Sequence, residues 1–449
     1  MKTTISIIIC KLITKVCHLF GRDGSVFPGS IAIKINKKSL WELEYPKFVI
    51  GVTGSSGKGS TVNMLEHILT SSGKKVIWNN NGSNIDNAII TLILNNTNAF
   101  THKVKGDIVL LELDERFING LFKPGTITHL ALTNITRDQP ARNAYPEFIY
   151  NAILNSLDNN MHLIINADDP IISRFKYDTA CKVTTYGIGN TKYDSDEAPL
   201  YGVDAAYCPK WHTKLKYSYY HYGHIGSYAC PKCDFERGQV NYEATNLDLE
   251  KGQFKINGKD IKLNKKVFFA AYYTLLAYAI ASTVGIDEES IINALNNNTI
   301  KSKRGKTYSL DNRTVEMLES KNENALSYLQ SLKYIKMQSG KKTVIMGFEN
   351  VSRRYEFNDL SWLWDVDFEL LNDKDVDKIF CIGRFKYDVK TRLEYAGIDM
   401  NKVVLIDDMN TLIERVKNES KGSIYTMVCF DMTAIIKNLL KDGIDEENN

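Results

Sequence analysis

Residues 48–61 read Phe48-Val49-Ile50-Gly51-Val52-Thr53-Gly54-Ser55-Ser56-Gly57-Lys58-Gly59-Ser60-Thr61. The first six are mostly apolar and predict a buried β-strand, and apolar residues at helical spacing from Val62 to Leu69 predict a helix. Between them, Gly54 and Gly57 let the backbone approach an anion, and Lys58 adds a positive charge. The pattern therefore predicts a phosphate-binding loop between a strand and a helix, the context that such a motif requires.

The loop departs from the eight-residue Walker A pattern, because Val52 replaces its first glycine and Gly59 follows the lysine. The shorter form Thr-Gly-x-x-Gly-Lys-x-Ser remains, and in it Ser60 is the expected magnesium ligand. An ordinary strand-turn-helix corner without a ligand is the alternative. We expect nucleotide phosphates to contact the whole loop: Gly54, Ser55, Ser56, Gly57, Lys58, Gly59, Ser60 and Thr61.

Length and composition indicate a globular protein of two or three domains, with 449 residues, 43% of them apolar and 24% charged. The net charge of +3 gives no sign of a nucleic-acid partner. No stretch reaches the roughly 18–20 apolar residues that a membrane span requires. We therefore expect a cytoplasmic protein without a transmembrane segment.

Residues 5–20 are apolar but are interrupted by Lys11, Lys15 and His18. We interpret them as an amphipathic helix whose apolar face packs on the following domain. Contact with the inner face of a membrane is the alternative for this helix.

Polar residues follow several of the apolar runs that predict parallel strands. The run from Ile108 ends in acids, of which Glu112 is the expected magnesium ligand, and a solvated strand end is the alternative. Asn134 ends the next run and is expected to contact the nucleotide, because ligands gather at the carboxyl ends of such strands. Asp168 and Asp169 follow a further run and bind ribose or adenine, or else cap a turn before Pro170.

Three of the eight cysteines stand out from the apolar surroundings of the others. Cys208, Cys230 and Cys233 form one complete and one incomplete Cys-Pro-x-Cys knuckle, with Trp211 in place of the fourth cysteine. Paired knuckles of this kind bind structural zinc through thiolates. We expect either a zinc site, with His212 or His224 as a possible fourth ligand, or a ribbon held by aromatic packing alone.

The chain is expected to contain an N-terminal helix and linker (1–47), an α/β nucleotide domain (48–300) with the cysteine ribbon inserted at 205–237, and a second α/β domain (301–449). Arg304, in the basic linker between the two α/β domains, either reaches an ATP phosphate or is solvated.

In the second α/β domain, apolar runs at 342–348, 378–383, 402–406 and 423–430 predict a mainly parallel sheet. Between its first two strands lies the tryptophan segment, which we define as residues 358–369. This segment combines Asp359, Asp365 and Asp367 with Trp362 and Trp364. Loops hold functional residues more often than packing residues, so this composition indicates a functional loop.

Together these features resemble a known family. The phosphate loop is similar to that of the Mur ligases and folylpolyglutamate synthases, which activate a carboxylate as an acyl phosphate. The cysteine ribbon and the tryptophan segment narrow the resemblance to MurT, the Mur-ligase-like subunits of lipid II isoglutaminyl synthase. Further shared features, which extend over nearly the whole chain, are Phe27-Pro28-Gly29, Glu112-Leu113-Asp114-Glu115, Arg137-Asp138-Gln139 and Asn166-Ala167-Asp168-Asp169-Pro170.

The resemblance implies an ATP- and magnesium-dependent ligase that phosphorylates the α-carboxylate of D-glutamate in the lipid II stem peptide, after which ammonia forms the amide. It also implies a separate glutaminase subunit, GatD, that supplies the ammonia within a heterodimer. In this family an aspartate of the C-terminal domain completes the partner's catalytic triad, and by position that residue is Asp359. Lys58 would then offset charge on the transferred phosphoryl group.

The chain diverges from the family in the phosphate loop, at Trp211 and just before Asp359, where Glu356-Phe357-Asn358 replaces the usual Asp-Gly-Arg. Because of these departures, the expected acceptor is either lipid II or another lipid- or nucleotide-linked cell-wall peptide. The same departures also leave a second hypothesis, a stand-alone Mur-like ligase that adds an amino acid to a precursor. A non-enzymatic scaffold is disfavoured by the presence of Lys58, Ser60 and Glu112.

Overall fold

The computed structural model describes residues 1–79, 84–116, 120–138, 145–199, 203–297, 307–320, 324–349 and 359–441. The chain divides into two compact units. Unit 1 comprises residues 1–135, 146–197 and 205–299, and unit 2 comprises residues 136–145, 198–204 and 300–449. The N-terminal helix belongs to unit 1, and two short segments between residues 136 and 204 belong to unit 2. The domain boundaries expected from the sequence stay a prediction.

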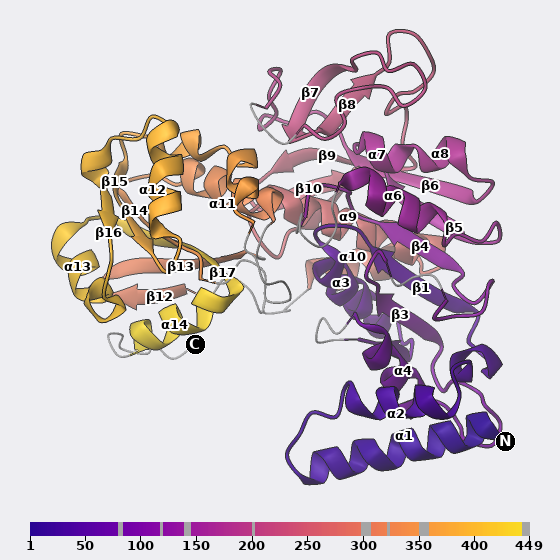
Figure 1. Ribbon diagram of the computed structural model, residues 1–449. Helices are drawn as coiled ribbons and strands as arrows, with labels where there is room; N and C mark the ends of the chain where they lie inside the picture. Colours follow the sequence, from indigo (N-terminus) through magenta and orange to yellow (C-terminus); the bar gives the residue numbers. More distant parts are fainter. Residues whose placement is uncertain are drawn as a thin grey trace. The chain divides into compact units, whose positions relative to one another are not determined.

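Unit 1 is built on a nine-stranded sheet with the strand order β11-β10-β9-β6-β5-β4-β1-β3-β2 (Figure 1). Strands β9 to β2 in this order are parallel, and β10 and β11 form an antiparallel edge. The strands are β1 (Phe48–Thr53), β2 (Val76–Trp78), β3 (Ile108–Glu112), β4 (His129–Leu132), β5 (His162–Asn166), β6 (Lys182–Ile188), β9 (Tyr242–Asp248), β10 (Gln253–Ile256) and β11 (Lys259–Lys262).

The helices of unit 1 cover this sheet, so its central strands are buried and read as continuous apolar runs. Helix α9 is buried along most of its length, which explains why its apolar residues show no single face. The helices are α1 (Lys2–Leu19), α2 (Phe27–Ile35), η1 (Ser39–Glu42), α3 (Lys58–Ser71), α4 (Asp86–Asn95), α6 (Pro146–Leu154), α7 (Pro170–Ser173), α8 (Phe175–Asp178), α9 (Phe268–Thr283) and α10 (Glu288–Asn296).

The cysteine ribbon is an antiparallel hairpin of β7 (Lys216–Tyr222) and β8 (Ile225–Ala229) that stands apart from the main sheet (Figure 1). Its own small core contains Leu215, Tyr228 and Phe235 beside the cysteines. The ribbon therefore combines aromatic packing with a cluster of thiols.

Unit 2 holds a six-stranded sheet with the order β12-β13-β17-β14-β15-β16, parallel except for the pair β12-β13. Its strands are β12 (Thr307–Leu310), β13 (Arg313–Ser320), β14 (Lys342–Gly347), β15 (Val376–Ile382), β16 (Val403–Leu405) and β17 (Ser423–Cys429). Its helices are α11 (Ala325–Met337), η2 (Ser361–Asp365), η3 (Phe368–Leu371), α12 (Lys386–Tyr395), η4 (Met400–Lys402), η5 (Met409–Thr411), α13 (Leu412–Glu419) and α14 (Phe430–Lys441).

The N-terminal helix forms as expected, and its Ile7 and Cys10 pack into the core of unit 1, but a second apolar face of the helix is exposed. Thr3, Ser6, Ile7 and Cys10 are its buried residues, and most of its large apolar side chains are exposed. The sequence has apolar residues on both faces of this helix, so periodicity could not tell which face is buried. Among the described residues, no helix is long and apolar enough to cross a membrane.

Candidate functional site

The phosphate loop connects the carboxyl end of β1 to the first turn of α3. Gly57 has a φ of +87°, a left-handed conformation that glycine adopts without strain. Gly54 has a φ of +124°, and a Cβ there would collide with the Thr133 hydroxyl. The two glycines predicted from the motif are therefore required by the backbone path of the loop.

Asn134, at the end of β4, holds this loop from the side. Its carbonyl oxygen accepts a hydrogen bond from the Ser55 N–H (2.8 Å), and its Oδ1 accepts one from the Ser56 N–H (3.1 Å). Its Nδ2 donates in turn to the Ser56 carbonyl (3.1 Å). Asn134 thus fixes the loop backbone, and direct contact between Asn134 and a nucleotide stays a prediction.

Lys58 lies at the start of α3 and is bonded back across the loop. Its Nζ donates to the Gly54 carbonyl and lies 2.5 Å from Glu115 Oε1. Both side chains of this ion pair are about 5% exposed. Glu115 was predicted only as one of several acids at the end of β3, and the structure pairs it with the lysine.

Glu112, the last residue of β3, is positioned by Asn79. The Glu112 N–H donates to Asn79 Oδ1 (2.8 Å), and Asn79 Nδ2 donates to the Glu112 carbonyl (2.9 Å). Glu112 Oε2 lies 3.0 Å from the position that a Cβ on Gly59 would occupy. The carboxylate therefore lies against Gly59 in the first turn of α3, and Ser60 is the next residue in that turn. A carboxylate together with a hydroxyl suits magnesium.

Asp168 and Asp169 are both fully buried. Asp168 accepts hydrogen bonds from Arg237 Nε (2.6 Å), the Ile188 N–H (2.7 Å) and the Tyr272 hydroxyl (2.7 Å). Asp168 thereby connects the sheet to Arg237, at the end of the cysteine ribbon, and to α9. Arg237, which contacts Asp168, was not among the site residues predicted from the sequence.

Asp169 caps α7, accepting from the N–H groups of Ile171 (2.8 Å) and Ile172 (3.3 Å), and it also accepts from the Ile135 N–H (2.8 Å). This is the capped turn before Pro170 that the sequence left open as an alternative. Nucleotide binding by either aspartate stays a prediction.

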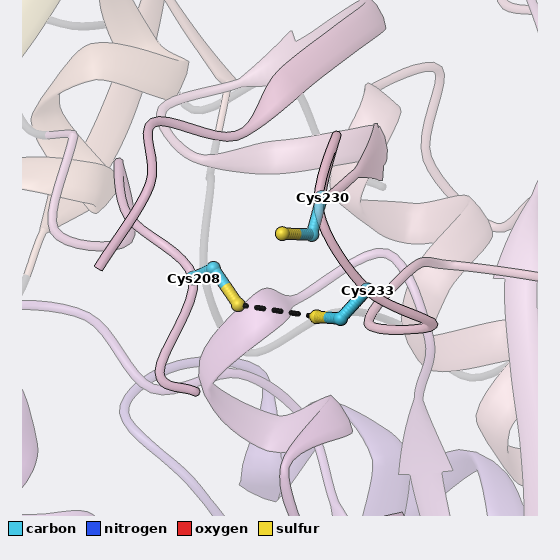
Figure 2. Close-up of side chains that lie close together, drawn as sticks. All are labelled: Cys208, Cys230 and Cys233. Carbon is cyan, nitrogen blue, oxygen red and sulfur yellow. Dashed lines mark hydrogen bonds between the residues drawn. The ribbon is translucent and has the colours of Figure 1, made fainter. Parts of the chain in front are cut away.

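The three cysteines of the ribbon come together (Figure 2). Their sulfur atoms lie within 4.8 Å of one another, and Cys208 Sγ is 3.6 Å from Cys233 Sγ. A tetrahedral zinc site with Zn–S bonds of about 2.3 Å requires sulfur atoms about 3.8 Å apart, so the donor set fits the metal. Within the described ranges, neither His212 nor His224 joins this group.

The two histidines lie elsewhere for identifiable reasons. His224 is buried with its Nε2 3.4 Å from Asp169 Oδ1, whereas His212 is exposed in the turn after Cys208. Trp211, which stands where the fourth cysteine was expected, is 60% exposed. The protein itself thus supplies three ligands among the residues that the structure describes.

The tryptophan segment, described from Asp359 onward, is anchored by one tryptophan. Trp362 is 1% exposed and packs against Tyr328 and Phe348, with ring centroids 4.9 and 5.3 Å away. Arg392, also buried, donates to the Leu363 and Val366 carbonyls. The backbone of the segment is therefore held firmly in unit 2.

The three aspartates of the segment have different surroundings. Asp359 is half-buried, and its Oδ1 accepts from the Ser361 N–H (2.8 Å) at the start of η2. Asp365 pairs with Arg137 (2.9 Å). Burial, together with nearby Glu369, raises the pKa of Asp367 to about 6.

Arg137 and Asp138 belong to unit 2 although they follow β4 in the chain. Arg137 Nε lies 2.7 Å from Asp204 Oδ1, in addition to the pair with Asp365. Asp138 Oδ1 accepts from Nδ2 of Asn324, the residue that caps α11 (2.9 Å). Arg304, the remaining predicted site residue, lies outside the described residues.

The loop, its lysine and the acids at the end of β3 lie in a part of the chain that is similar to the Mur ligases. Residues 52–215 match the family model for the Mur ligase middle domain. A pseudomurein peptide ligase type C from Methanothermus fervidus has a similar fold, with a TM-score of 0.66 at 19% identity over 90% of this chain and 79% of that one. MurF from Acinetobacter baumannii gives 0.63 at 14% identity over 92% and 80% of the two chains. The expected α/β fold is confirmed.

The particular relatives are MurT subunits. Residues 321–434 match the family model for the MurT ligase C-terminal domain. The chain is 28% identical to the lipid II isoglutaminyl synthase (glutamine-hydrolyzing) subunit MurT of Staphylococcus aureus (strain COL), over 90% of each chain. It is 24% identical to the subunit of that name from Streptococcus pneumoniae, over 98% of this chain and 97% of the other. The resemblance to MurT is confirmed.

Proposed function

We propose that this chain is the ATP-dependent synthetase subunit of an amidotransferase that amidates a cell-wall precursor. The acceptor is the α-carboxylate of D-glutamate in lipid II or an analogous lipid- or nucleotide-linked stem peptide. The observation that carries the proposal is that one chain joins a Mur-type phosphate loop to a MurT-type C-terminal domain containing Asp359.

The reaction has two steps. The acceptor carboxylate attacks the γ-phosphorus of ATP, which gives an acyl phosphate and ADP, and ammonia then displaces inorganic phosphate and loses a proton to form the amide. Lys58 and the loop N–H groups stabilise the charge on the transferred phosphoryl group. Before the nucleotide arrives, the ion pair with Glu115 holds the Lys58 ammonium in position. Bound phosphates then compete with Glu115 for this ammonium.

Magnesium is expected to bind between Ser60 and Glu112 and to neutralise phosphate charge there. Asn79 and Asn84 support this role, because they hold the backbone and the carboxylate of Glu112 (Asn84 Nδ2 to Oε1, 3.5 Å).

The ammonia is supplied by a glutaminase subunit of the GatD type. A glutaminase that uses a cysteine and a histidine needs a carboxylate to orient the histidine. Asp359 fits this task because it is accessible, and its position is fixed by the Ser361 N–H and by the buried Trp362 nearby. We place the complex in the cytoplasm.

The decisive experiment compares Asp359→Asn with Asp408→Asn in the chain purified together with its glutaminase, which mass spectrometry would identify by stoichiometric co-elution. Asp408 is the matched control because its Oδ1 accepts a hydrogen bond from the N–H two residues later (Asn410), as the Oδ1 of Asp359 does from Ser361. We expect Asp359→Asn to lower glutamine-dependent amidation about 100-fold and to leave ammonia-dependent amidation unchanged, because only the triad would be affected.

Equal glutamine-dependent rates in the wild type and Asp359→Asn would overturn the assignment of Asp359. A chain that elutes alone, and that consumes ATP with an amino acid and a precursor, would establish the stand-alone ligase instead.

We also propose that the three cysteines hold a structural zinc ion, with a small exogenous ligand in the fourth position. Metal analysis should find one zinc per chain, and Cys230→Ser should lose it and lower the melting temperature. Cys181→Ser is the control, because that cysteine lies outside the cluster. A metal-free wild-type protein with an unchanged melting temperature in Cys230→Ser would leave aromatic packing as the sole support of the ribbon.

A further inference from the structure

Helix α1 presents a stripe of apolar side chains to solvent. Ile5, Ile8, Leu12, Val16 and Leu19 recur every three or four residues and are 41%, 38%, 56%, 48% and 84% exposed. At that spacing they share one face of the helix. Figure 1 shows α1 at the outer edge of unit 1, with α2 and α4 on its other side.

The buried face of α1 combines the core residues Ile7 and Cys10 with hydroxyl side chains, so apolar residues lie on both faces of the helix and not on one alone. Thr3 donates to Glu42 and accepts from Asn36 Nδ2 (2.8 Å), and Ser6 donates to the Ala32 carbonyl (3.3 Å). These specific bonds fix the rotation of the helix about its axis, so the outward position of the apolar stripe is built into the packing.

Further contacts hold the other half of the helix. Lys11 Nζ donates to the Thr97 carbonyl (2.5 Å), and Asn95 Nδ2 donates to the Thr14 hydroxyl (3.0 Å). Thr4 Oγ1 lies 3.0 Å from His102 Nε2, so the loop after α4 runs beside α1. That loop carries a further apolar side chain, Phe100, which is 85% exposed.

The surroundings of the stripe are strongly basic. Residues 1–38 contain one acidic residue, Asp23, and seven basic residues, which are Lys2, Lys11, Lys15, Arg22, Lys34, Lys37 and Lys38. On the helix, Lys2 borders the stripe on one side and Lys15 on the other. The neighbouring loop adds exposed Lys105, and also Lys103, which is paired with exposed Glu44 (3.2 Å).

We infer that this face of α1 is a membrane-binding surface that lies on a bilayer containing anionic lipids. Apolar side chains enter the boundary between headgroups and acyl chains, and the flanking lysines contact the lipid phosphates. A second copy of the chain is disfavoured as the occupant, because pairing two such helices would bring their basic borders together. The inference goes beyond the proposed function, since it requires neither ATP nor a glutaminase.

The test is co-sedimentation of the full chain with vesicles of phosphatidylcholine alone and with vesicles in which about a third of the lipid is phosphatidylglycerol. We expect binding to the anionic vesicles that weakens with salt. The double variant Ile8→Asp/Leu12→Asp should bind about tenfold more weakly or worse, because charges replace inserted apolar groups. Phe148→Asp is the matched control, because Phe148 is 57% exposed on α6 and should leave binding unchanged.

A second measurement does not depend on loss of binding. The chain has five tryptophans of its own, so the wild-type fluorescence emission is subtracted. The remaining emission of Leu12→Trp should shift to the blue on adding anionic vesicles, whereas that of Phe148→Trp should not shift. Equal binding to both vesicle types, or equal binding of the wild type and the double variant, would overturn the inference. It would also be overturned by a wild-type dimer that the double variant dissociates while neither protein binds vesicles. ATP turnover on a soluble precursor is measured separately, so a failed membrane test leaves the proposed function standing.

Discussion

The phosphate loop and the tryptophan segment each follow a central parallel strand, but they present their charged side chains differently. In the phosphate loop, Lys58 is buried and already paired with Glu115. In the tryptophan segment the buried anchor is Trp362, while Asp359 remains accessible. The first arrangement is an ion pair completed within the chain, whereas the second leaves a carboxylate accessible, as the proposed contact with a glutaminase requires.

The largest effect is expected from Lys58→Met, which removes the charge that stabilises phosphoryl transfer. We expect a loss of about 1,000-fold in amidation with either glutamine or ammonia as the nitrogen source, because both require the acyl phosphate. Lys74→Met, at an exposed lysine after α3, is the control.

Since removing Lys58 leaves Glu115 buried without its partner, the double variant Lys58→Met/Glu115→Gln should recover stability but not activity. If ammonia-dependent activity survived in either variant, the loop would not be the site of phosphoryl transfer.

A smaller effect is expected from the anchor of the tryptophan segment. Trp362→Ala should destabilise unit 2 by about 3–5 kcal/mol, because it leaves a cavity beside Tyr328 and Phe348. Trp364→Ala is the matched control, since Trp364 is 45% exposed and should cost far less. Thermal unfolding measures both, and equal costs would show that the segment is not anchored by one tryptophan.

The smallest effect is a pH-dependent one at Asp367. Its pKa is raised to about 6, so the folded state binds this proton more tightly than the unfolded state, and the stability contribution is lost as the pH rises from about 4 to 6. Asp367→Asn should therefore stabilise the protein by about 1–2 kcal/mol at pH 8 and have little effect near pH 4, allowing for partial solvent screening. A stabilisation equal at both pH values would contradict the burial of this charge.

The sequence predicted the features that depend on local patterns. Apolar runs located the parallel strands of both units, and the glycines around Lys58 located the loop. The spacing of Cys230 and Cys233, together with Cys208, indicated a thiol cluster that the structure assembles. These signals are strong because each reflects a requirement that few other residue types satisfy.

What the sequence could not supply was the choice among chemically similar groups. Glu112 ends β3 and Glu115 follows it, and only the fold brings Glu115 to Lys58. Asp168 reads as a possible nucleotide ligand, yet its partners Arg237 and Tyr272 come from distant parts of the chain. The orientation of α1 depended in the same way on hydroxyl contacts of Thr3 and Ser6 that no periodicity reveals.

The placement of residues 136–145 and 198–204 in unit 2 has a practical consequence for dividing the protein. A fragment cut at residue 301 would lack Arg137, leaving Asp365 without its ion-pair partner, and would lack Asp138, which bonds the cap of α11. The N-terminal fragment would keep Arg137 and Asp138 but lack Asp365 and Asn324, which they contact. Residues 301–449 are therefore not an independently excisable module, and truncation or domain exchange should carry both short segments with them.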